Sequence, residues 1–171
     1  MRVNEISPQQ EHPANDKQNK EYKFKKILIA IDKSGFKEKI IQNGIVLSKA
    51  FDSSLLAIHV LDKAAMGMEW NLLSFYRGGR IENYESALIK ESEELLNEVK
   101  IMAQKHGIAV ETKVIINSPS SAESIIDYAK DNGVDLIIIG TKGLAGIDKF
   151  VMGGVANKVI SHAHCRVLAI R

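Results

Sequence analysis

Four of the glycines at residues 140–154 have a spacing that could build an anion-binding site. They follow or precede predicted elements: Gly140, Gly143, Gly153 and Gly154. The apolar run 136–139, which lacks a polar break, is typical of a strand buried on both faces. A segment of helical character begins at Val155. Glycine lets a backbone approach a phosphate closely, and the free N–H groups at a helix start point toward an anion.

In a second interpretation, the same glycines only end and begin secondary-structure elements. Gly140 would then simply end a strand, and Gly153 would start a helix. A Walker A motif and the dinucleotide fingerprint G-x-G-x-x-G are both absent from the sequence. Spacing alone therefore does not decide between an anion-binding site and glycines that only end or begin elements.

Composition places the chain among soluble globular proteins. Its 171 residues, 45% hydrophobic and 26% charged, suffice for one domain with a sizeable core. The net charge of +2 gives no reason to expect nucleic acid or an anionic membrane as a partner. The single cysteine, Cys165, excludes an internal disulfide and is expected to act as a small buried apolar residue. No apolar run reaches membrane-spanning length and the start has no signal-like core, so we expect a cytoplasmic location.

Hydrophobic periodicity predicts strands and helices in strict alternation. The predicted strands are 26–31, 54–61, 108–116, 136–139 and 166–170, and the predicted helices are 36–50, 80–106, 120–132 and 155–163. Residues 1–21 are too polar to offset chain entropy by burial, so we expect a disordered tail before a domain at 22–171. Alternation of this kind predicts an α/β fold with an open parallel sheet and helices on both faces.

Three further features of the pattern bear on function. Ligands of parallel sheets bind beyond the carboxyl ends of the strands, where Asp32 and Gly140 would face one cleft if their strands are neighbours. His59, inside the second strand, is expected to be a satisfied core histidine rather than a ligand. The segment 64–79 carries many large apolar side chains, which favours a lid or a subunit contact over a loop packed on its own domain.

Four segments of the chain resemble the universal stress protein family. The sequence GTKG at 140–143, nine residues and then GGVA at 153–156 resemble that family's G-x2-G-x9-G-[S/T] signature. KKILIAIDKS at 25–34 and AIHVLD at 57–62 resemble its first two strands, and VISHAHCRVLAI at 159–170 resembles its ending. The match covers about residues 25–171.

The resemblance implies a Rossmann-like sheet of five parallel strands in the order 3-2-1-4-5, with ATP, with or without Mg²⁺, at the switch point. By matching position, adenine and ribose would lie beside Ala30, Ile31, Asp32, Val60, Ile139 and Gly140, with Asp32 accepting from ribose hydroxyls. The phosphates would lie among Lys142, Gly143, Gly153, Gly154 and Val155, although Lys142 can equally be an exposed surface lysine. The resemblance also implies a homodimer through the strand at 166–170, whose apolar edge would otherwise be open.

The chain departs from the family pattern in three places. Gly154 stands where the signature has Ser or Thr, so one hydroxyl donor to phosphate is missing while backbone donors remain. Asn117, Ser118 and Pro119 replace a glycine-x-proline turn, with little expected consequence. His164 and Arg166 replace two prolines near the end.

These features leave three functions to weigh. The leading one is an ATP-binding stress-response protein that signals to a regulatory protein partner, at most a weak ATPase because no motif residue is an evident general base. The second is a dimeric interaction module of the same family that binds no nucleotide, which the loss of the hydroxyl at Gly154 favours. The third, an ATP-dependent transferase or pyrophosphatase of similar fold, lacks any second substrate motif.

Overall fold

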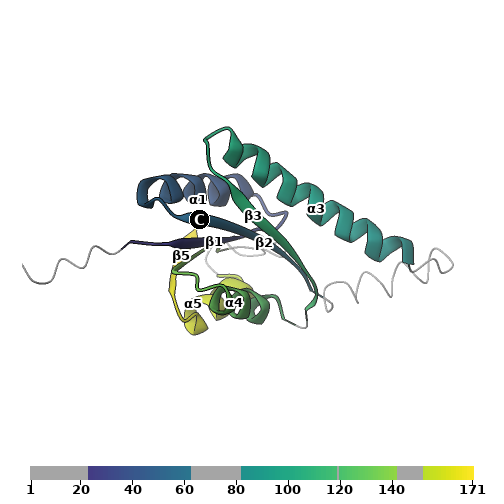
Figure 1. Ribbon diagram of the computed structural model, residues 1–171. Helices are drawn as coiled ribbons and strands as arrows, with labels where there is room; N and C mark the ends of the chain where they lie inside the picture. The colour runs from purple at the N-terminus through teal and green to yellow at the C-terminus, as the bar shows by residue number, and fades with distance from the viewer. Residues whose placement is uncertain (1–22, 63–81, 119, 142–151) are drawn as a thin grey trace, which may run out of the picture.

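The chain folds into one five-stranded parallel sheet in the order β3-β2-β1-β4-β5 (Figure 1). A computed structural model describes residues 23–62, 82–118, 120–141 and 152–171. The elements are β1 (Lys26–Ala30), α1 (Lys37–Phe51), β2 (Ser54–Asp62), α3 (Glu82–Gln104), β3 (Val110–Ser118), α4 (Ser121–Asp131), β4 (Leu136–Gly140), α5 (Gly154–His162) and β5 (Arg166–Ile170). The predicted fold class and strand order are therefore confirmed.

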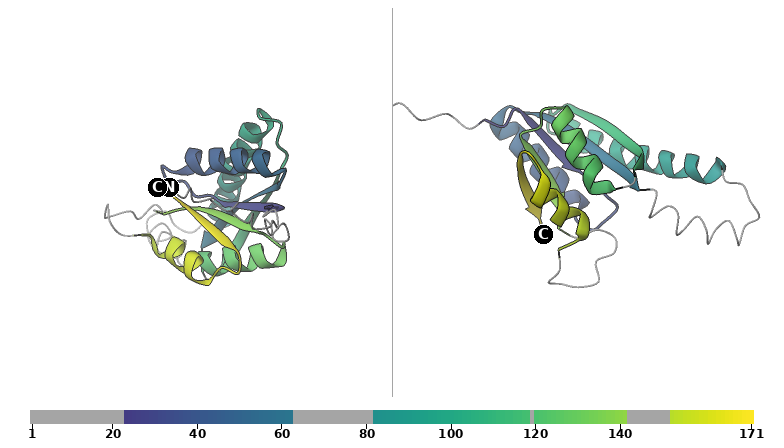
Figure 2. Two further views of the ribbon diagram at one scale, coloured as in Figure 1. Left: turned by 90° about the vertical axis from the view of Figure 1, so that its left-hand side faces the viewer. Right: turned by 90° about the horizontal axis from the view of Figure 1, so that it is seen from below.

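Helices cover the two faces of the sheet in pairs. Helices α1 and α3 lie on one face, and α4 and α5 lie on the other, as the views from the side and from below agree (Figures 1 and 2). Successive side chains of each strand point to opposite faces. Ile27, Ile29 and Ile31 therefore join the core under α1 and α3, whereas Leu28 and Ala30 join the core under α4 and α5.

Sequence alternation predicted the edge position of β3 correctly. β3 is the outermost strand beside β2, and Glu111 and Lys113 are exposed, as expected of a half-exposed strand. The strand runs past the predicted end at residue 116, because Ser118 still pairs with Asp62 beyond an irregularity in the ladder. The pairing could not be read from local composition, since it depends on the partner strand.

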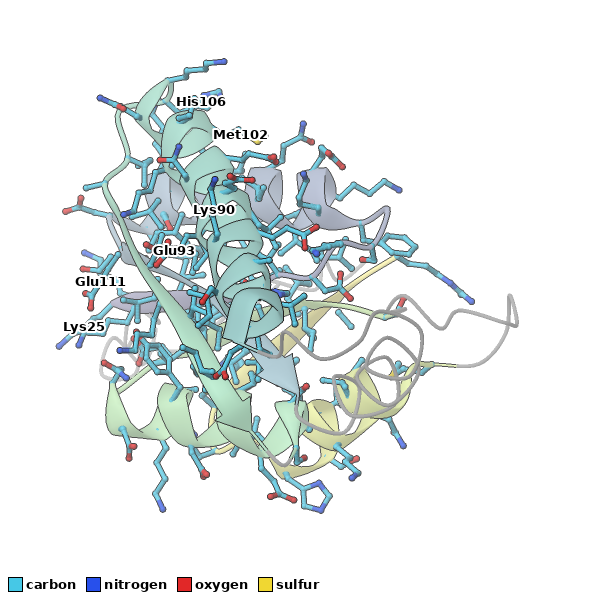
Figure 3. The ribbon with its side chains drawn as sticks, turned by 90° about the vertical axis from the view of Figure 1, so that its right-hand side faces the viewer. Lys25, Lys90, Glu93, Met102, His106 and Glu111 are labelled. Atoms are coloured by element: carbon cyan, nitrogen blue, oxygen red, sulfur yellow. The ribbon has the colours of Figure 1, made fainter. Side chains whose placement is uncertain are left out.

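The charged residues of α3 form a solvated face, as their spacing predicted. Glu91, Glu93 and Glu94 are exposed. Figure 3 looks onto this helix, with Lys90 and Glu93 on it and His106 just past its end. Between them Ser92 is fully buried and donates a hydrogen bond of 2.6 Å to the Leu88 carbonyl. The acidic run is therefore a surface feature rather than a carboxylate pair.

Gly44 lets α1 pack closely on the sheet. A Cβ atom there would lie 2.8 Å from Ile29 Cγ2 and 3.3 Å from Leu55 Cδ1. Ile29 is fully buried and branched at Cβ, so it cannot turn away. We expect Gly44→Ala to lower the free energy of unfolding by about 1–2 kcal/mol, because overpacking outweighs the helix propensity of alanine.

Urea unfolding of the Gly44 variant beside Gly35→Ala tests this packing. Gly35 has nothing within 4 Å of its added Cβ, so its variant should match the unchanged protein. Equal stability of the two variants would show that α1 has room to move off the sheet.

Asp135 ties three strands together at their amino ends. Its Oδ2 accepts hydrogen bonds from the backbone N–H groups of Lys25 and Lys26, at 2.8 and 2.9 Å. Its own N–H donates to the Lys26 carbonyl, and its carbonyl accepts from Arg166 N–H. The starts of β1, β4 and β5 are therefore fixed to one another by a single residue.

Strand β5 forms the other edge of the sheet. Arg166 N–H donates to the Asp135 carbonyl, and the Ile170 carbonyl accepts from Thr141 N–H. Because backbone groups alternate in direction along a strand, Leu168 also faces β4, whereas Val167 and Ala169 turn their N–H and C=O groups to the outer edge. The outer edge is the surface to which a further strand could pair.

The remaining expectations concern the polar tail, the apolar segment, Cys165 and membrane-spanning helices. The predicted tail at 1–21 and the segment 64–79 lie outside them. Cys165 is half-buried and packs against the core under α4 and α5, and burial raises the pKa of its thiol. No helix in the described part of the chain is both long and apolar enough to cross a bilayer.

Candidate functional site

The carboxyl ends of β1 and β4 lie side by side at the point where the winding of the sheet reverses. β1 pairs with β2 on one side and β4 on the other, and Ala30 lies opposite Ile139. The chain runs outward from β1 to β3 in one direction and from β4 to β5 in the other. Such a switch point is where open parallel sheets bind ligands.

The end of β1 presents a carboxylate oriented by a short turn. Asp32 Oδ1 accepts a hydrogen bond of 2.9 Å from the N–H of Ser34, two residues further on. The other carboxylate oxygen has no hydrogen-bond partner among the described residues. It is therefore available to accept from a ligand hydroxyl, the role expected of this residue.

The predicted adenine-side residues divide between the two faces of the sheet. Ala30 and Ile139 are buried in the core under α4 and α5, and Val60 is half-buried against the same core. Ile31 is buried on the opposite face, under α1 and α3. A ligand on the α5 side would therefore meet the Ile31 backbone rather than its side chain.

The end of β4 connects to the start of α5 through Thr141. Its carbonyl accepts a hydrogen bond of 2.8 Å from Gly153 N–H, while its N–H bonds to the Ile170 carbonyl at 2.8 Å. Gly153 is the N-cap of α5, and the Gly153 carbonyl accepts the first helical bond, from Asn157 N–H. These bonds hold the helix start beside the end of β4.

The amides at the start of α5 are the available anion donors. The Gly153 N–H is already used by Thr141. The N–H groups of Gly154, Val155 and Ala156 have no acceptor within the helix, because an α-helix leaves its first N–H groups unpaired. Since the first turn also lacks an acidic residue and a side-chain cap, this helix start favours a negatively charged ligand.

Two hydroxyl groups at the same end of the sheet were not singled out from the sequence. Ser34 Oγ and Thr141 Oγ1 are shielded from solvent without a hydrogen-bond partner among the described residues. Leaving a buried hydroxyl unpaired costs about 1–3 kcal/mol. Ser48 Oγ in α1 is in the same state, but it lies in the helix layer rather than beside a strand end.

Ser34 and Thr141 could have been identified from the sequence by where they stand relative to the predicted strands. Each is a small hydroxyl residue within four positions after the last paired residue of β1 or β4. Because the carboxyl ends of adjacent parallel strands meet, such residues gather at one site. Lys142 and Gly143 lie outside the described residues, so their predicted places beside phosphate stay predictions.

Metal binding by protein ligands alone finds no support in this part of the chain. Within the described residues, no three His, Cys, Asp or Glu side chains gather closely enough to hold a metal ion. The site instead offers one carboxylate oxygen, two hydroxyls and a row of backbone amides. That set suits a ligand carrying both hydroxyl groups and negative charge.

Comparison with known proteins agrees with this architecture. The family model described as universal stress protein family matches residues 23–171. Universal stress protein MJ0531 of Methanocaldococcus jannaschii is 32% identical over 158 residues, covering 90% of this chain and 85% of that protein.

Two solved universal stress proteins share the fold and contain adenine nucleotides. One, from Archaeoglobus fulgidus in complex with dAMP, has a TM-score of 0.61 and 21% identity, covering 86% of this chain and 98% of that chain. Another, in complex with cAMP, has a TM-score of 0.59 and 16% identity, covering 87% and 98%. At these identities the solved structures support the fold alone, and the family is established by the family model and by MJ0531. The chain belongs to the universal stress protein family.

Proposed function

We propose that this protein binds ATP at the switch point between β1 and β4 and acts as a regulatory nucleotide switch. The observation that carries the proposal is that the Asp32 carboxylate follows β1, while the bond from Gly153 to Thr141 holds the unpaired amides of α5 beside the end of the neighbouring strand β4. A carboxylate oxygen suits ribose hydroxyls, and helix-start amides suit phosphates. The dAMP and cAMP complexes of other family members add support for an adenine nucleotide.

The two unpaired hydroxyls strengthen the case for a polar ligand. Ser34 Oγ and Thr141 Oγ1 would gain partners if phosphate or ribose oxygens entered the site. Thr141 Oγ1 would then compensate in part for the hydroxyl missing at Gly154. Any Mg²⁺ would be bound chiefly through phosphate oxygens, as is usual for that ion. Hydrolysis in this proposal is slow at most, and the protein works in the cytoplasm through a regulatory protein partner.

Homodimerisation through β5 is part of the same proposal. The outward backbone groups of Val167 and Ala169 offer an edge for antiparallel pairing with a second copy. Leu168 and Ile170 pack partly against the core under α1 and α3, and Val167 against the core under α4 and α5. A second copy would cover what remains exposed on both faces of this edge.

Direct identification of a bound nucleotide tests the proposal. The protein is purified without added nucleotide and denatured, and the released small molecules are identified by mass spectrometry. Titration calorimetry with ATP then measures binding to the protein stripped of ligand. Absence of both released nucleotide and binding heat at millimolar ATP would reject the nucleotide function and leave the dimeric interaction module, which the loss of the hydroxyl at Gly154 favours.

Restoring the hydroxyl is expected to tighten ATP binding. A Cβ added at Gly154 meets nothing within 4 Å, so Gly154→Ser fits the existing backbone. A hydrogen bond to a charged phosphate contributes about 1.5–3 kcal/mol, so the affinity measured by calorimetry should rise about tenfold or more. Gly154→Ala adds the same Cβ without a hydroxyl and is the matched control. If serine binds ATP no better than alanine does, no phosphate lies beside residue 154.

A further inference from the structure

His59 makes a buried hydrogen bond to the end of β1 from the face opposite the proposed ligand. Its side chain is 8% exposed, and strand alternation places it on the face of Leu55 and Ala57, under α1 and α3. Its Nδ1 lies 2.7 Å from the Ile31 carbonyl oxygen. Because a carbonyl only accepts, Nδ1 carries the proton and donates.

This bond stands where the ladder between β1 and β2 stops. The register ends at Ala30 opposite Ile58, and Ile31 N–H still donates to the Ile58 carbonyl at 2.9 Å. In a continuing parallel ladder the Ile31 carbonyl would accept next from Val60 N–H. Among the described residues it accepts from the His59 ring instead, so the backbone of Val60 is not used by β1.

The His59 bond acts on the peptide unit that leads into Asp32. The Ile31 carbonyl and the Asp32 N–H belong to the same planar group, so fixing the carbonyl fixes the direction in which the chain enters Asp32. On the other side, Ser34 N–H holds Asp32 Oδ1 at 2.9 Å. The Asp32 side chain is thus oriented from its own backbone and from the following turn.

We propose that His59 is a positioning residue for ribose recognition, which it serves by fixing the Ile31 peptide and hence the Asp32 carboxylate. The inference rests on the proposed nucleotide function, because it assigns His59 a role in that same site. His59 itself does not contact the ligand, since its ring lies on the α1 and α3 face. The expectation of a satisfied core histidine is correct about its environment and misses this consequence.

Two substitutions separate the donor from the bulk of the ring. His59→Phe keeps an aromatic ring and removes the donor. His59→Asn keeps an N–H donor at nearly the position of Nδ1 in a smaller side chain. We expect His59→Phe to weaken ATP binding about tenfold, as loss of the Asp32 bond would, and His59→Asn to restore part of that loss.

The ribose hydroxyls provide the readout that a general packing role would not change. Calorimetry compares ATP with 2′,3′-dideoxy-ATP, which lacks both hydroxyls. The unchanged protein should prefer ATP, and His59→Phe should lose most of this preference. In the Asp32→Ala background, His59→Phe should cause little further loss, because the two changes remove one interaction. An equal loss for both nucleotides, persisting without Asp32, would overturn the inference.

A measurement without nucleotide keeps the test independent of the proposed function. Amide hydrogen exchange of Ser34 reports its bond to Asp32 directly, and His59→Phe should speed this exchange while leaving amides at the amino end of β1 protected. Unchanged exchange at Ser34 would overturn the positioning role even in a protein that binds ATP. Faster exchange in a protein that binds no ATP would uphold the positioning of Asp32 and reject the nucleotide function.

Discussion

Replacing Asp32 with alanine is expected to weaken ATP and ADP to the same extent, by about tenfold to a hundredfold. The reason is that, in the proposed site, the available carboxylate oxygen would accept from ribose hydroxyls, which the two nucleotides share. A contact with the terminal phosphate would weaken ATP alone. Titration calorimetry of both nucleotides distinguishes these cases.

Asp32→Asn is the matched control for the turn. Its side-chain carbonyl can still accept from Ser34 N–H, so the local backbone is kept while the negative charge is lost. An affinity between those of the unchanged protein and the alanine variant is expected. If 2′,3′-dideoxy-ATP loses as much affinity as ATP in Asp32→Ala, the carboxylate does not bind the ribose.

A proline at residue 169 is expected to convert a dimer into a monomer. Ala169 directs its N–H to the outer edge of β5, so proline there removes a donor for strand pairing without touching the ladder to β4. Leu168 lies one residue earlier and faces β4, so proline at 168 would break the sheet itself. The alternation of backbone groups therefore makes 169 the informative position.

Light scattering and sedimentation at micromolar concentration measure the change. Ala169→Val keeps the N–H and adds a side chain of high strand propensity, so this control should remain a dimer. Circular dichroism should show that both variants are folded. An unchanged protein that sediments as a monomer would contradict pairing through β5.

Local pattern was sufficient to predict the elements of this fold. Helix α3 was expected at 80–106 and runs Glu82–Gln104, and α5 was expected at 155–163 and runs Gly154–His162. At the start of α4, the expected cap is present, since Ser120 Oγ accepts from Glu123 N–H at 3.4 Å. The neighbour relation of β1 and β4 needed the family resemblance, because periodicity does not order parallel strands.

For the candidate site, the sequence predicted the positions of several residues along the chain but not the contacts between them. Asp32 follows β1, Gly140 ends β4 and Gly154 begins α5, so these candidate residues lie at the ends of the expected elements, and their contacts with a ligand stay a prediction. The bond from His59 to Ile31 spans 28 residues, and the bond from Gly153 to Thr141 depends on how α5 docks. Such contacts arise from tertiary packing, so no local sequence pattern predicts them.

The attachment of three strands to Asp135 has a consequence for the entropy of ligand binding. The strands are fixed to one another at their amino ends by the bonds to Lys25, Lys26 and Arg166. Ligand binding at the opposite end then need not order the sheet, since the strands already have their relative positions. In the proposed site, the strands would therefore lose little conformational entropy when a ligand binds. Because Asp135 already fixes the strands at their amino ends, less binding free energy at the opposite end would be lost to ordering them.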